Sequence, residues 1–236
     1  MDTIPAYISY TFVAITVATL SFVIYAVSNA APDKSNNTST IVLTFLVIWL
    51  FVIALATFQD FFADQEAFPP RLFLPIVSAL LAILILFIHP SSRRFILEMP
   101  ITTLTYIHII RIPVEIVLWW LSNHGAVPQE MTFAGTNYDI LTGVTAPFAA
   151  IFLVGMRSQS TFAAIVWNLA GLGLLFNIVL TAIRATPYFY NPDLFSIPNV
   201  AVFEFPFIWL PTFVVPCVFF CHVASIFKLI KGKEEE

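Results

Sequence analysis

Seven long apolar stretches recur along this sequence, and they constrain its fold more than any other feature. They cover residues 4–27, 40–58, 72–88, 101–121, 138–154, 162–183 and 202–229. A helix needs roughly 20 mostly apolar residues to cross the hydrocarbon core of a bilayer. Only 10% of the 236 residues are charged, whereas an ordinary soluble domain carries about 25%. The sequence therefore predicts an all-α membrane protein, a single bundle of seven transmembrane helices over residues 1–236.

Lysine and arginine are distributed unequally between the two sets of loops, which predicts the orientation of the bundle. One set, with the C-terminal segment, carries Lys34, Arg93, Arg94, Arg157, Lys228, Lys231 and Lys233. The opposite set carries Arg71, with Arg184 at a helix end. Cytoplasmic loops are the more basic ones. We therefore expect the N-terminus outside and the C-terminus in the cytoplasm.

The stretch 101–121 carries three ionisable residues, His108, Arg111 and Glu115. On a helix they fall within an arc of about 60° and so share one face. Charged groups in hydrocarbon are costly, so they normally point into the bundle and mark a functional site. Arg111 and Glu115 are four residues apart and can pair with each other. Pro113 between them removes one helical hydrogen bond, which predicts a kink.

Other predicted helices supply polar partners for this face. They are Asn137 and Asp139 at the start of 138–154, Asn177 and Arg184 on 162–183, and Glu204 near the outer end of 202–229. A cavity that opens outward is the simplest arrangement that satisfies these groups. We expect it to bind a small molecule or a lipid headgroup in a receptor-like or binding role. An internal ion pair that only stabilises helix packing is the alternative interpretation of Arg111 and Glu115.

The loop 123–139 is long for this chain and carries His124 and Glu130. It can fold over the outer mouth as a lid, or it can be an ordinary turn in which Asn137 or Asp139 caps the next helix. Asn168 and Asn177 are typical of hydrogen bonds between helices. Gly171 and Gly173 are typical of close helix packing.

Three runs in the middle of the chain resemble one group of proteins. They are Arg111-Ile-Pro-Val-Glu115, Met131-Thr-Phe-Ala-Gly135 and Asn137-Tyr-Asp-Ile-Leu-Thr-Gly143-Val-Thr-Ala-Pro147. The group consists of uncharacterised bacterial multi-span proteins. The resemblance implies a bacterial inner (plasma) membrane and adds no mechanism.

Several functions are disfavoured by what the sequence lacks. A retinal pigment needs a lysine inside a span, and the four lysines fall in loops or at the inner end. No two of the four histidines have the helical spacing of a zinc motif, so we expect no cofactor. A metal site is disfavoured, and it would require the fold to bring His108 and Glu115 together with His124 or Asp139. There is no basic block for nucleic acid. Two alternatives stay open, a non-catalytic subunit of a larger membrane assembly and an intramembrane enzyme that uses His108 and Glu115.

Overall fold

A computed structural model describes residues 4–30, 37–64, 67–155 and 160–231, and within these ranges the regular secondary structure is entirely helical. The helices are α1 (Ala6–Ala30), α2 (Thr38–Phe58), α3 (Phe73–Ile88), α4 (Pro90–Glu98), α5 (Ile101–Tyr106), α6 (Arg111–Asn123), α7 (Ile140–Phe148), α8 (Thr161–Ala185) and α9 (Val215–Lys231). Short 3₁₀ or π-helical turns lie at Ile107–Ile110, Gln129–Met131, Ala149–Leu153, Ala201–Phe203 and Leu210–Val214.

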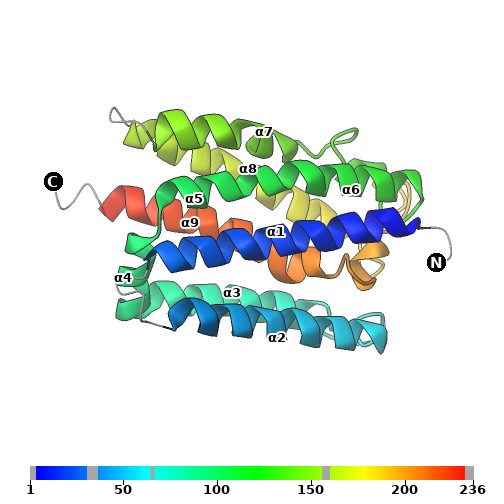
Figure 1. Cartoon of the computed structure of the whole chain (residues 1–236). Helices are drawn as coiled ribbons and strands as arrows, with labels where there is room; N and C mark the ends of the chain where they lie inside the picture. The colour runs from blue at the N-terminus through cyan, green and yellow to red at the C-terminus, as the bar shows by residue number, and fades with distance from the viewer. Residues whose placement is uncertain (1–3, 31–36, 65–66, 156–159, 232–236) are drawn as a thin grey trace.

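Five helices are long and apolar enough to cross a membrane. They are Ala6–Ala30, Thr38–Phe58, Ile101–Asn123, Thr161–Ala185 and Leu210–Lys231, and each overlaps a predicted span. Counted as one span, α3 and α4 would be a sixth, although they are bent by 90° at their junction. The helix Ile140–Leu153 is apolar but shorter. In Figure 1, α3 and α7 run alongside the long helices, and α4 turns across one end of the bundle.

The interruption between α5 and α6 follows from Pro113. This residue cannot donate a hydrogen bond to the carbonyl of Ile109, four residues earlier. The helix tightens there into the 3₁₀ turn Ile107–Ile110. The sequence predicts a kink at this place, and the structure has a tightened turn there, within the single apolar helix Ile101–Asn123.

The last helix begins later than the sequence predicts, at Leu210 instead of residue 202. Residues 205–208 form turns, and Pro206 has no N–H with which to continue a helix. Further along, Pro216 leaves the carbonyl of Thr212 without its helical donor. The indole Nε1 of Trp49 on α2 donates to that carbonyl at 3.0 Å. A side chain from another helix thus satisfies the backbone group that the proline exposes, as burial in a membrane requires.

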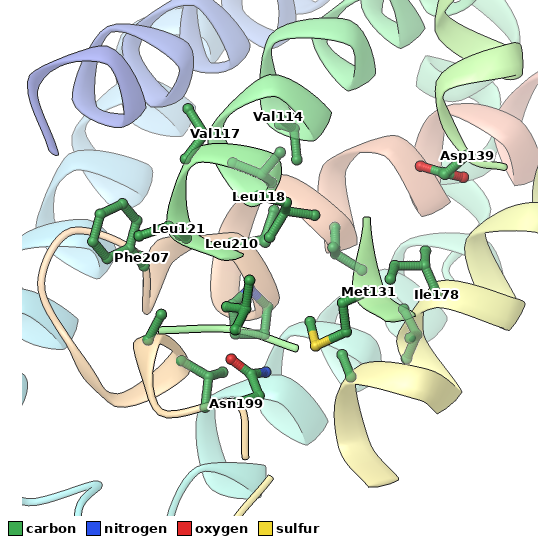
Figure 2. Close-up of a pocket in the computed structure, with 18 of the residues that line it drawn as sticks. Val114, Val117, Leu118, Leu121, Met131, Asp139, Ile178, Asn199, Phe207 and Leu210 are labelled. Carbon is green, nitrogen blue, oxygen red and sulfur yellow. The ribbon is translucent and has the colours of Figure 1, made fainter. Parts of the chain in front are cut away.

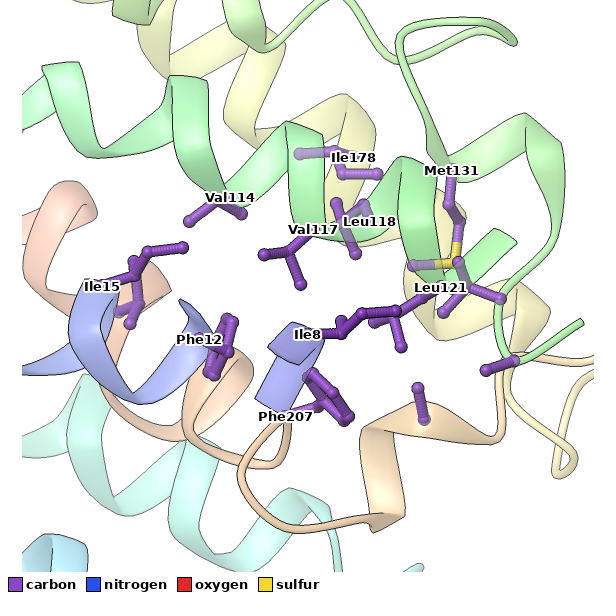
Figure 3. Packing of buried hydrophobic residues seen from close by; sticks show 14 of the residues in the cluster. Ile8, Phe12, Ile15, Val114, Val117, Leu118, Leu121, Met131, Ile178 and Phe207 are labelled. Atoms are coloured by element: carbon purple, nitrogen blue, oxygen red, sulfur yellow. The ribbon is translucent and has the colours of Figure 1, made fainter. Parts of the chain in front are cut away.

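The main hydrophobic core lies where α1, α6 and the segment before α9 meet. Figure 3 shows Ile8 of α1 between Val117 of α6 and Phe207, all of them buried, and the ring of Phe12 packs 5.5 Å from that of Phe207. Apolar side chains on the outer surfaces of α2 and α3 are exposed instead of buried, and Phe51 and Ile85 are each 61% exposed. Apolar side chains at that exposure fit hydrocarbon surroundings, since soluble proteins rarely present large continuous apolar surfaces to water.

The basic residues of α4 and α9 meet at one end of the bundle. Lys228 donates to the carbonyls of Leu97 and Met99, the second at 2.8 Å. The guanidinium carbon of Arg93 lies 5.4 Å from the centre of the Phe227 ring. Lys34, Arg157 and Lys233, which also entered the orientation prediction, lie outside the described residues.

Candidate binding site

Seven polar side chains form one buried group in the interior of the bundle, which we call the polar cluster. Its members come from α6 and the turn before it, the start of α7, α8 and α9. They are His108, Arg111, Glu115, Asn137, Asp139, Asn168 and His222, and each is at most 6% exposed. The predicted polar face of 101–121 therefore does point inward, and it meets partners from three other segments.

Arg111 forms its ion pair with a residue of another helix. Its Nη1 lies 3.2 Å from Oδ1 of Asp139, at the start of α7. Both Nη atoms also donate to the carbonyl of Gly171 on α8, at 3.4 Å. The predicted pairing of Arg111 with Glu115 along one helix is replaced by this contact between helices. Glu115 remains close enough to interact electrostatically with both Arg111 and Asp139.

Asn137 links Glu115 to the loop before α7. Its Nδ2 donates to Oε1 of Glu115 and, at 3.0 Å, to the carbonyl of Met131. Its Oδ1 accepts from the backbone N–H of Asp139 at 3.0 Å, which shapes the entry to α7. The backbone N–H of Phe133 also lies close to the Glu115 carboxylate. The second oxygen of this carboxylate, Oε2, is buried and lies within hydrogen-bonding distance of no group in the described ranges.

Two histidine rings stack in the part of the cluster nearer α9. The ring centres of His108 and His222 are 3.7 Å apart, at an interplanar angle of 21°. Asn168 holds the pair in place, because its Oδ1 lies 2.8 Å from Nδ1 of His222. Trp167 packs 5.6 Å from both rings. Stacked rings do not direct their nitrogens at one point, and no group of three potential metal ligands occurs among the residues described.

Two glycines allow the helices around the cluster to approach closely. A Cβ at Gly171 would lie 2.5 Å from Cε1 of His222. A Cβ at Gly143 on α7 would lie 2.9 Å from Cγ1 of Ile112 and 3.2 Å from the carbonyl oxygen of His108. The predicted close packing at Gly171 is confirmed. The same prediction is wrong for Gly173, because a Cβ added there would meet nothing within 4 Å.

A cavity of about 140 Å³ adjoins the polar cluster on the side of α6. Its walls are chiefly apolar, and Figure 2 shows Val114, Leu118 and Met131 among them. Arg111, Glu115 and Asp139 also line it, whereas His108 and His222 do not. The cavity is thus a hydrocarbon-lined space with ionisable groups on one side, which is less polar than the sequence predicts.

Three residues predicted for the site lie apart from the cluster. Asn177 is exposed, and its Nδ2 donates to the carbonyl of Thr136 at 3.3 Å. Arg184 is exposed near the C-terminal end of α8. Glu204 is half-buried in the turn that follows Ala201–Phe203. None of these three lines the cavity.

The loop predicted as a lid is joined to the segment between α8 and α9. Glu130 accepts hydrogen bonds from the backbone N–H and the hydroxyl of Ser196, at 3.3 and 3.2 Å. The carbonyl of Ala126 accepts from Val200 and Ala201. His124 instead turns back to its own helix, with Nδ1 2.8 Å from the carbonyl of Trp120. Of the two predicted lid residues, only Glu130 therefore ties the loop to another segment.

Sequence reasoning left two members out of the site, Asn168 and His222. The sequence predicts that Asn168 forms hydrogen bonds between helices, and this is confirmed, because its partner is His222 on α9. A histidine in an otherwise apolar helix is the signal that could have added His222, since such residues usually find a partner inside the bundle.

Residues 69–230 match a protein family described as a domain of unknown function, DUF8737. No curated protein and no solved structure matches the chain. The matched range begins just before α3 and ends within α9, so it includes every residue of the polar cluster. Since the match covers more than half of the sequence, this chain belongs to the DUF8737 family.

Proposed function

We propose that this protein is a membrane-embedded binding protein whose cavity takes up a small, largely apolar molecule. One observation carries the proposal: an apolar cavity ends at a buried carboxylate, Glu115, whose Oε2 has no partner among the described residues. Ligand pockets commonly combine apolar walls with a few convergent polar groups that orient the ligand. Arg111 and Asp139, which also line the cavity, each have one further buried atom without a hydrogen-bond partner among the described residues, and such atoms cost free energy unless a ligand or water satisfies them.

The proposal includes a topology of seven spans, with the N-terminus outside and the C-terminus in the cytoplasm, in a bacterial inner membrane. Helices α3 and α7 would complete the five longer spans, since both lie alongside them in Figure 1. The contacts between α4 and α9 support a shared cytoplasmic end, because they bring Arg93 and Lys228 together with the C-terminal end of the last span. Cysteine labelling in intact spheroplasts tests this: a cysteine at Arg94 should be protected from an impermeant maleimide, and one at Asp193 should react.

Filling the cavity tests the binding proposal directly. Leu118 is buried and projects toward the cavity in Figure 2. Leu118→Trp should occupy much of a space of about 140 Å³. Native mass spectrometry of protein extracted gently from its own membrane should show a bound small molecule that this variant lacks. Leu74→Trp is the matched control, because Leu74 is 52% exposed on α3 and does not line the cavity. A ligand retained by Leu118→Trp, or no ligand on any form, contradicts the proposal.

The two alternatives lead to different results in the same preparation. A subunit of a larger assembly would retain a stoichiometric protein partner in mild detergent. An intramembrane enzyme that uses His108 with Glu115 would need both side chains at one substrate. Glu115 lines the cavity, whereas the ring of His108 is stacked on His222 and does not. The geometry therefore favours binding over that reaction.

A further inference from the structure

The charges around the cavity are not balanced. Three ionisable side chains line it, one guanidinium from Arg111 and two carboxylates from Glu115 and Asp139. Arg111 is already paired with Asp139 at 3.2 Å and also contacts the carbonyl of Gly171. Once these two charges neutralise each other, the remaining ionisable group at the cavity wall is the carboxyl group of Glu115.

Glu115 is placed to receive one more hydrogen bond. Its Oε1 accepts from Asn137, and the backbone N–H of Phe133 lies near the carboxylate. Oε2 has no group within hydrogen-bonding distance in the described part of the chain. The residue is 1% exposed, so its surroundings do not screen the charge as water would. An anionic ligand would lie beside this carboxylate and repel it. A cationic group with N–H donors would both neutralise the charge and satisfy Oε2.

The apolar walls limit the rest of the ligand. A cavity of about 150 Å³ lined by Leu, Ile and Phe holds one benzene molecule, and the cavity here measures about 140 Å³. Val114, Leu118 and Ile178 offer it only hydrocarbon surface. Met131 adds a thioether, which makes favourable contacts with aromatic rings. A body about the size of one aromatic ring fits these walls.

We propose that the cavity binds a small lipophilic amine, with its ammonium group against Oε2 of Glu115 and its ring-sized apolar body against Val114, Leu118 and Met131. This inference rests on the proposed binding function and specifies its ligand class. It also gives Arg111 a defined part: Arg111 keeps Asp139 neutralised, so that a single carboxyl group is left for the ligand.

Three probes of similar shape and different charge test the ligand class: benzylamine, benzoate and toluene. Binding to the full-length protein is measured by ligand-observed NMR in one detergent, and the signal from Leu118→Trp is subtracted as background. We expect benzylamine to bind at least about tenfold more tightly than benzoate. The ammonium group of benzylamine would form a charge-assisted hydrogen bond with Glu115, whereas the carboxylate of benzoate would be repelled by it. Toluene should bind through its ring alone, more weakly than benzylamine.

Two variants assign the preference to one carboxyl group. Glu115→Gln keeps an oxygen for Asn137 and should weaken benzylamine binding about tenfold or more while leaving toluene unchanged. Asp193→Asn, in an exposed loop, should change neither. Equal binding of toluene and benzylamine with no effect of Glu115→Gln would overturn the amine inference and leave the binding function intact, as would tighter binding of benzoate. If none of the probes binds above the Leu118→Trp background, both proposals lose their support.

Discussion

Replacing Gly171 by alanine should destabilise the protein relative to the same replacement at Gly173, two residues further along α8. A Cβ at Gly171 would lie 2.5 Å from Cε1 and 2.7 Å from Nε2 of His222. At Gly173 an added Cβ would meet nothing within 4 Å. Both positions are in one helix and both changes are identical, so the difference between the variants reports the contacts of a Cβ at Gly171, which are with His222 and, at 3.0 Å, with Cγ2 of Thr142.

The magnitude follows from how little His222 can move. Its ring is stacked 3.7 Å from His108, and its Nδ1 lies 2.8 Å from Oδ1 of Asn168. Forcing a methyl group into such packing costs about 1–3 kcal/mol. Alanine gains about 1 kcal/mol of helix propensity over glycine at either position. Gly173→Ala should therefore stabilise by up to about 1 kcal/mol, and Gly171→Ala should lie about 1–3 kcal/mol below it.

The free energy of unfolding in mixed micelles titrated with SDS measures both variants against the wild type. A background with both His222→Ala and Thr142→Ser supplies the control, since it removes the imidazole ring and the Cγ2 methyl group that the added Cβ would meet. In that background the two alanine variants should differ by less than about 0.5 kcal/mol, the usual limit of additivity. Equal stability of the two variants in the wild-type background would refute the packing of His222 against Gly171.

Two further predictions concern other parts of the molecule. Arg111→Met leaves the buried carboxylate of Asp139 without its cation and should destabilise by about 3–5 kcal/mol; adding Asp139→Asn should recover most of the loss in the same unfolding assay. Burial, reinforced by Asp64 and opposed by Arg71, raises the pKa of Tyr188 in the loop after α8. Its neutral form is therefore favoured in the folded state, so its contribution to stability should be complete below about pH 10 and lost as pH rises through the raised pKa. Comparing the pH dependence of unfolding with that of Tyr188→Phe checks the sign.

The long helices could be predicted from the sequence because a membrane-spanning helix satisfies its own backbone hydrogen bonds. Whether residues 38–58 form a helix depends little on the neighbours of that segment. The start of the last helix was mispredicted for a related reason. Val202 and Phe203 are apolar and read as part of a span, whereas the helix begins only at Leu210. A hydropathy average depends only on side-chain composition, so it does not reveal that Pro206 has no backbone N–H with which to continue a helix.

The polar cluster could be predicted only in part. The inward face of His108, Arg111 and Glu115 follows from helical periodicity. The partner of Arg111 could not be predicted in this way, because the i,i+4 spacing makes Glu115 on the same helix as plausible a partner as Asp139 on α7. Asp139 takes that place, and Gly143 on the same helix lets α7 approach the backbone next to Arg111. Such proximity between helices is a property of the packed bundle, and one sequence does not specify it.

The two parts of the polar cluster, the Arg111–Asp139 ion pair and the His108–His222 pair, meet at Gly171. The carbonyl of Gly171 accepts from Arg111, whose partner Asp139 lines the cavity, and the missing Cβ of Gly171 makes room for His222. A shift of α8 at this point would disturb the ion pair and the histidine pair together. The family match includes all of these residues and excludes α1 and α2. Phe12 on α1 nevertheless lines the cavity. The chemical character of the site therefore resides in α6–α9, and α1 contributes shape alone.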